Sequence, residues 1–83
     1  MPSYPINVDE PRIYATSFSS NSFMYFRVAP LEGNPKQLNM VLMQDFIEAV
    51  TVEDPGQAVL LCQRLDLLAR PGACASTRRR AND

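Results

Sequence analysis

The segment that decides the fold covers residues 33–65, GNPKQLNMVLMQDFIEAVTVEDPGQAVLLCQRL, in which one short phrase occurs twice. The phrase is NPKQ at 34–37 and DPGQ at 54–57. Each copy is typical of a helix start. The Asn or Asp caps the first turn, proline fits the first helical position, and glutamine three residues after the cap completes a capping box. The two copies therefore predict two helices, at about 35–50 and 55–70.

The spacing of apolar residues supports the first of these helices. At ~100° per residue they fall in one broad arc, and polar side chains gather on the opposite side. The apolar arc consists of Met40, Leu42, Met43, Phe46, Ile47 and Val50, and the polar side of Gln44, Asp45 and Glu48. This pattern predicts an amphipathic helix.

The same segment has a competing interpretation as two strands joined at Gln44 and Asp45. A turn of two residues needs glycine or asparagine, which are absent there, although the β-branched residues at 50–52 do favour a strand. Glu48 would also share a face with Phe46 and Val50, which is poor alternation. The helix is preferred, and the alternative is a four-stranded antiparallel meander closed by helix 55–70.

Upstream, residues 12–29 read RIYATSFSSNSFMYFRVA, two runs rich in aromatic and β-branched residues around a polar stretch at 19–22. This pattern predicts a β-hairpin with a four-residue loop. If Phe18 pairs with Phe23, the hairpin has two apolar sides. The side expected to pack on the helices carries Ile13, Ala15, Met24, Phe26 and Val28, and the other carries Tyr14, Phe18, Phe23, Tyr25 and Arg27.

These elements predict an α+β fold with three parts along the chain. Residues 1–11 contain three prolines and should form an extended arm. Residues 12–70 should form a single α+β domain, in which the hairpin packs on the two helices. Residues 71–83 are small, polar and basic, and are expected to be a flexible tail.

The 83 residues carry a net charge of −1, but the charges are unevenly distributed. Without Arg78, Arg79 and Arg80, residues 1–77 contain five basic and eight acidic side chains. An acidic body argues against wrapping a phosphate backbone, because non-specific binding to nucleic acid depends on clustered basic groups. The arginine run alone remains a candidate for contacting phosphate.

The N-terminal residues resemble no signal peptide, and no apolar run approaches the ~20 residues that span a bilayer. The only two cysteines, Cys62 and Cys74, are too few for a disulfide scaffold and are expected to be free thiols in a reducing compartment. A cytoplasmic location is therefore expected.

No pattern of catalytic residues is present. The chain has no histidine, no zinc-binding spacing, no P-loop and no nucleophile motif, so neither an enzyme nor a metal or cofactor site is expected. Asp45 and Glu48 are one helical turn apart and are interpreted as a solvated helix face. Cys62 is expected to be a small hydrophobic residue of the core.

Two apolar surfaces exceed what one small core needs. The first is the aromatic hairpin side, whose aromatic residues and arginine are the types enriched at binding hot spots. The second is the pair Leu60 and Leu67 on the outer face of helix 55–70, which predicts a homodimer seam about a two-fold axis.

The resulting hypothesis is a small non-enzymatic protein-binding module, an inhibitor or adaptor that occupies a partner surface. Many phage-encoded antagonists of host proteins share this size and composition, which is an analogy of composition only. The alternative is a small nucleic-acid-binding regulator, in which the hairpin aromatics stack on bases and Arg27 and the arginine run contact phosphate.

Overall fold

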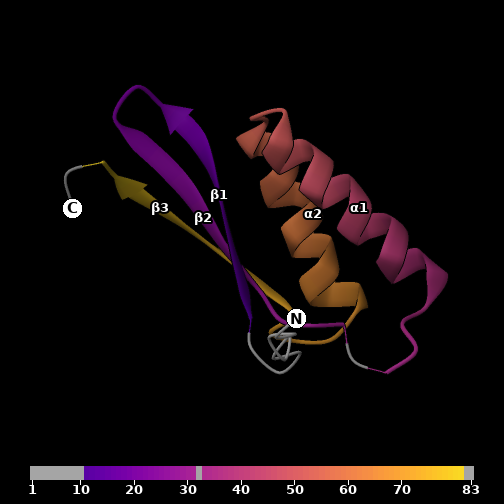
Figure 1. Cartoon of the computed structure of the whole chain (residues 1–83). Helices are drawn as coiled ribbons and strands as arrows, with labels where there is room; N and C mark the ends of the chain where they lie inside the picture. The colour runs from indigo at the N-terminus through magenta and orange to yellow at the C-terminus, as the bar shows by residue number, and fades with distance from the viewer. Residues whose placement is uncertain (1–10, 32, 82–83) are drawn as a thin grey trace, which may run out of the picture.

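The computed structural model describes residues 11–31 and 33–81, and the predicted arm at 1–11 lies almost wholly outside these residues. The elements are β1 (Arg12–Ser19), β2 (Ser22–Val28), α1 (Gln37–Thr51), α2 (Pro55–Leu68) and β3 (Cys74–Arg80). The strands form one antiparallel sheet in the order β1-β2-β3, with both helices on the same side of it (Figure 1). The predicted α+β fold is confirmed, and the four-stranded meander is wrong because residues 37–51 are helical.

The repeated phrase starts a helix only in its second copy. Asp54 caps α2 as predicted, since its Oδ1 accepts a hydrogen bond from the Gln57 backbone N–H at 3.1 Å and Pro55 occupies the first position. The first copy fails because Lys36 is extended (φ −62°, ψ 149°), so α1 begins only at Gln37. Asn34 is then too far upstream to cap the first turn, and no side chain does so.

The turn between the helices is a Schellman motif at the end of α1. The Glu53 N–H donates to the Val50 carbonyl at 3.1 Å, and the Asp54 N–H donates to the Ala49 carbonyl at 2.9 Å. Glu53 is left-handed, with φ 56°, in the position that glycine usually occupies. This tight turn places Asp54 at the start of α2.

The core lies between the sheet and the helix pair. Phe26 of β2 and Phe46 of α1 are fully buried and meet edge to face, with ring centroids 5.1 Å apart. Leu65 of α2 is fully buried in the same cluster, where Leu42 and Leu61 are also buried. Burying a side chain of this size contributes roughly 1.5–3 kcal/mol, so these few residues carry much of the stability of a small chain.

The hairpin differs from the prediction in its register. The turn contains only residues 20 and 21, and Ser19 pairs with Ser22. A bulge at Phe18 then shifts β1 by one residue, so that Ser17 pairs with Phe23 and Ile13 with Arg27. A shift of one residue moves every side chain of a strand to the other face. The assignment of faces is therefore right for β2 and wrong for β1.

β3 is the element that the sequence did not predict. Residues 74–80, which belong to the expected flexible tail, pair along the whole length of β2, from Val28 with Cys74 to Ser22 with Arg80. Gly72 redirects the chain after α2 with φ 83°, and its N–H donates to Asp66 Oδ1 at 2.6 Å. The expectation that this region frays is wrong, because β3 pairs with β2 along its whole length.

Cys62 and Cys74 form a disulfide that joins α2 to β3, with Cα atoms 5.3 Å apart. Both cysteines are buried. The expectation of two free thiols is therefore wrong, and the argument for a reducing compartment loses its basis, because disulfides persist mainly in oxidising ones. Within the described ranges, neither helix is long and apolar enough to cross a membrane.

Candidate interaction surface

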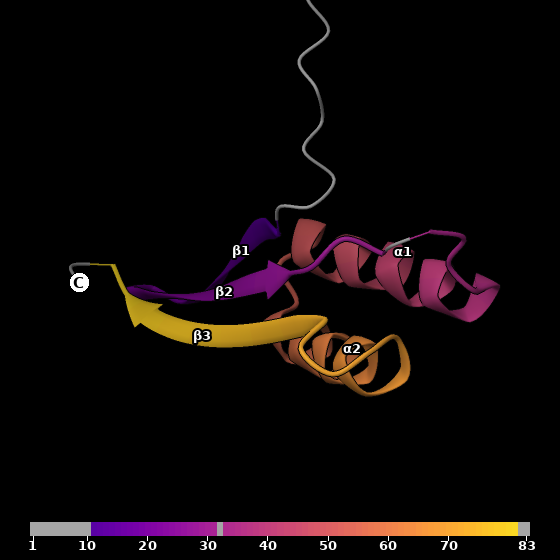
Figure 2. The ribbon, with the colours of Figure 1, turned by 90° about the horizontal axis from the view of Figure 1, so that it is seen from below.

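The sheet has one face that the helices leave uncovered. Met24, Phe26 and Val28 are buried against the helices, so their neighbours in β2 point to the opposite side. We call that side the outer face. Following the pairing across the three strands, it consists of Ile13, Ala15, Ser17, Phe23, Tyr25, Arg27, Ala75, Thr77 and Arg79. The hairpin turn and the end of β3 point away from the helices (Figure 2).

Two aromatic rings and an arginine lie together on the outer face, in its middle row and in the row nearest the hairpin turn. The ring centroids of Phe23 and Tyr25 are 6.4 Å apart. Arg79 pairs with Phe23 across the β2–β3 ladder, and its guanidinium carbon lies 6.0 Å from the centre of the Tyr25 ring. The guanidinium therefore lies over one side of the aromatic pair, with Tyr25 37% exposed and Phe23 half-buried.

Arg27 and Ile13 extend this surface towards the other end of the sheet. They pair with each other across the β1–β2 ladder, and Ala75 pairs with Arg27 from β3. Ile13, which was expected to pack on the helices, is 64% exposed, and the bulge at Phe18 is the physical reason. The outer face thus combines an aromatic pair, an exposed aliphatic side chain and two arginines.

Tyr14 does not belong to the predicted partner surface. It pairs with Phe26 on the helix side, and its ring meets Phe46 edge to face with centroids 5.3 Å apart. Tyr14 is partly buried against the core. Its assignment to the aromatic partner face is therefore wrong, because the shifted register turns it inward.

Phe18 also lies apart from the other predicted partner residues. It is 44% exposed at the hairpin end, and the Arg78 guanidinium carbon lies 4.4 Å from its ring centre. Arg78 pairs with Met24, which faces the helix side. Of the five predicted partner residues, Phe23, Tyr25 and Arg27 share the outer face.

The fold separates the charges of the chain into two regions. The three strands contain five arginines and no carboxylate, namely Arg12, Arg27, Arg78, Arg79 and Arg80. Residues 37–68, which form α1, the turn and α2, contain five carboxylates and one arginine. Among the described residues, no carboxylate is paired with the strand arginines. The acidic body inferred from sequence is therefore an acidic helix layer beside a basic sheet.

The predicted dimer seam lies on the outside of α2. Leu60 is 55% and Leu67 79% exposed, so nothing in the described part of the chain covers them. Leu68 is also exposed beside Leu67. The exposure of both leucines is what a dimer seam requires, and nothing in the structure shows which surface covers them.

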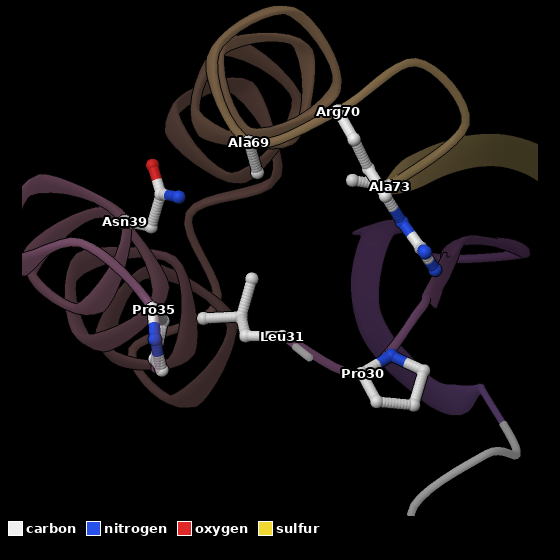
Figure 3. A pocket seen from close by; sticks show the side chains of 7 residues that line it. All are labelled: Pro30, Leu31, Pro35, Asn39, Ala69, Arg70 and Ala73. Atoms are coloured by element: carbon white, nitrogen blue, oxygen red, sulfur yellow. The ribbon is translucent and has the colours of Figure 1, made fainter. Parts of the chain in front are cut away.

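Two hollows bordered by described residues are too small or too open to define a ligand site. One, of about 120 Å³, lies where Leu31 points between Asn39 of α1 and Ala69, the C-cap residue of α2 (Figure 3). Pockets for small molecules are usually about 300–1,000 Å³. A second, open hollow is bordered by Asp45, Glu48 and Asp54. Within residues 11–31 and 33–81, no group of carboxylates and cysteines is arranged to hold a metal ion.

Sequence reasoning missed Arg79 as a member of the aromatic surface. No apolar alternation marks residues 74–80, and an arginine run at the end of a chain is usually solvated. Thr77 is the one residue of this segment that favours a strand, and a single residue is a weak cue. The pairing of β3 with β2 is what brings Arg79 beside Phe23 and Tyr25.

Comparison with known proteins found no matching family model, no similar curated protein and no similar solved structure.

Proposed function

We propose that this chain is a small non-enzymatic binding module that occupies an acidic surface of a partner protein through its outer face, as an inhibitor or adaptor. The observation that carries the proposal is the group formed by Phe23, Tyr25 and Arg79 on an uncovered sheet. Aromatic residues and arginine dominate binding energy at protein interfaces, especially where the rings fill the centre of the contact.

The chemistry of the partner follows from charge. Arg27 and Arg79 stand on the outer face, and no described carboxylate is paired with either of them. A partner surface that carries Asp or Glu around an apolar centre would pair with these arginines and bury the rings between them. Ile13 adds aliphatic surface that suits a protein partner better than a charged polymer.

A second candidate is a single-stranded nucleic acid, and one observation favours it: the strands carry five arginines and no carboxylate. Stacked aromatic rings beside arginines are typical of surfaces that bind unpaired bases. Two features favour protein instead. Only two of the five arginines lie on the outer face, and α1 and α2 present carboxylates that would repel a long phosphate chain.

The experiment compares what the immobilised wild type and two variants retain from a lysate of the source cells, with and without nuclease. Tyr25→Ala removes the exposed ring, and Gln63→Ala, on the exposed side of α2, is the matched control. After nuclease treatment, we expect the wild type and Gln63→Ala to retain an acidic protein. Tyr25→Ala should no longer retain it. Material that disappears with nuclease, or a protein retained equally by all three, would contradict it.

A homodimer through Leu60 and Leu67 remains part of the proposal, since a small core gains stability when a second copy covers exposed leucines. A cytoplasmic site of action also remains a proposal, and it requires that the disulfide persist among cellular thiols. Burial of Cys62 and Cys74 supports persistence, because exchange needs access for an attacking thiolate. Alkylation of the protein in intact cells, followed by mass spectrometry, would measure the oxidised fraction.

A further inference from the structure

β3 is an edge strand with an uncovered backbone. The sheet order is β1-β2-β3, so β3 pairs only with β2 among the described elements. Ala75 to Arg80 are all exposed. An exposed edge offers a row of N–H and C=O groups to a further strand.

The pattern of the antiparallel ladder identifies which groups face this edge. The Ala29 N–H donates to the Ala73 carbonyl at 2.8 Å, and the Ala81 N–H donates to the Asn21 carbonyl at 2.8 Å. Residues of an antiparallel strand bond alternately to one side and the other. The odd-numbered residues of β3 therefore bond to β2, and Ser76, Arg78 and Arg80 direct their backbone N–H and C=O to the free edge.

The arginines along this edge disfavour a second copy of β3 as its occupant. Arg78, Arg79 and Arg80 are consecutive, so two antiparallel copies of β3 would gather six arginines along one short ladder. The strands carry no carboxylate that could offset this charge. When the two copies pair over their full length, Arg78 lies opposite Ser76 of the other copy and Arg80 opposite Cys74. The unfavourable effect is therefore the mutual repulsion of six uncompensated positive charges on one small sheet.

The same arginines are complementary to an acidic strand. Side chains alternate along β3, so Arg78 and Arg80 stand on the helix side and Arg79 on the outer face. An added strand with carboxylates on both of its faces would meet an arginine on each. Backbone pairing then supplies affinity, and the charges select the partner.

We propose that β3 accepts an acidic, extended segment of the partner as a fourth strand of the sheet, at the edge formed by Ser76, Arg78 and Arg80. This inference rests on the proposed function, because it specifies how the acidic partner is held. The added strand would lie next to Arg79 and would continue the outer face beside Tyr25.

The test uses a synthetic peptide of repeated Glu-Glu-Val-Val, which places glutamates on both faces of an extended strand, and a matched peptide of equal charge in which the valines are prolines. Ser76→Pro deletes one edge-facing N–H without changing charge, and proline is tolerated at such positions of edge strands. Ser76→Ala is the matched control, because it changes the same side chain but keeps the edge-facing N–H. Binding is measured by calorimetry for the wild type and both variants.

We expect the valine peptide to bind the wild type and Ser76→Ala equally well. Ser76→Pro should bind it about tenfold more weakly, because backbone pairing carries the affinity. Equal binding of the valine and proline peptides would show attraction by charge alone and would overturn the proposal. Preferential binding of an oligothymidylate would also overturn it, and so would equal binding of the valine peptide by Ser76→Pro and Ser76→Ala.

Hydrogen exchange in the wild type keeps the test valid if Ser76→Pro does not fold. The peptide should slow exchange at the Ser76 and Arg78 amides, while the Thr77 and Arg79 amides, already bonded to β2, should change little. Unchanged exchange at Ser76 and Arg78 with peptide bound would overturn the proposal. That result would not contradict the proposed function, because the Tyr25→Ala comparison tests the outer face separately.

Discussion

Cys62 and Cys74 are covalently joined, and the bond fastens the start of the edge strand β3 to the middle of α2. The sequence separation of 12 residues encloses the whole segment that turns from the helix into the strand. The disulfide is therefore positioned to hold β3 on the sheet, and with it the three arginines.

Replacing both cysteines by alanine should lower the free energy of unfolding by about 3 kcal/mol, because a cross-link around a loop of this length restricts the unfolded chain. Urea unfolding of the oxidised wild type and the double variant measures the difference. Dithiothreitol should shift the wild-type midpoint towards that of the variant and leave the variant unchanged. Equal midpoints for all samples would show that the cross-link contributes nothing.

Glu53→Gly should raise the free energy of unfolding by about 1 kcal/mol, since Glu53 holds a left-handed conformation that glycine adopts without steric cost. Removal of one carboxylate from the acidic turn is a separate effect, and Glu53→Gln is the matched control for it. Thermal unfolding should rank glycine above glutamine at this position. The opposite ranking would contradict the Schellman geometry at the end of α1.

Thr16→Val should stabilise the chain by about 1 kcal/mol. Thr16 is 3% exposed, and its Oγ1 has no hydrogen-bond partner among the described atoms, so the hydroxyl is buried at a cost that a methyl group of the same shape avoids. Thr77→Val, on the exposed part of β3, is the comparison that measures the change in strand propensity alone. A destabilised Thr16→Val would mean that a water molecule satisfies the hydroxyl.

Leu67→Glu should shift a dimer towards monomer in sedimentation velocity at micromolar concentration, because it places a charge in the centre of the proposed seam on α2. The residue is 79% exposed, so the fold itself should tolerate the change. Leu65→Ala should instead destabilise the chain by about 2–5 kcal/mol, since Leu65 is fully buried. A wild type that sediments as a monomer at high concentration would contradict the proposed homodimer.

The helices and β2 could be predicted because their own residues carry the information. The Asp54 cap directly precedes α2, and the apolar arc around Phe46 lies within α1. Which side chains of β1 face the helices could not be predicted, because this depends on one bulged residue, Phe18. The pattern of apolar residues does not indicate the bulge. β3 depends on pairing with a strand some fifty residues earlier, and the disulfide depends on that pairing, so both are consequences of the tertiary fold.

For the same reason the candidate surface was found only in part. Phe23, Tyr25 and Arg27 come from one strand whose alternation is visible in the sequence. Arg79 lies beside them because β3 pairs with β2, and Tyr14 lies on the opposite face because of the shifted register of β1. Local pattern identified the strand that carries the surface, and the fold determined its remaining members.

The affinity of Tyr25→Ala for the partner tests the central claim most directly, with Phe26→Ala as the comparison on the opposite face. Loss of a hot-spot aromatic costs about 2 kcal/mol or more, so we expect Tyr25→Ala to bind about thirtyfold more weakly in calorimetry, with little change in its unfolding midpoint. Phe26→Ala should instead lose about 3–5 kcal/mol of stability, since Phe26 is fully buried. Wild-type affinity in Tyr25→Ala would contradict a partner surface on the outer face of the sheet.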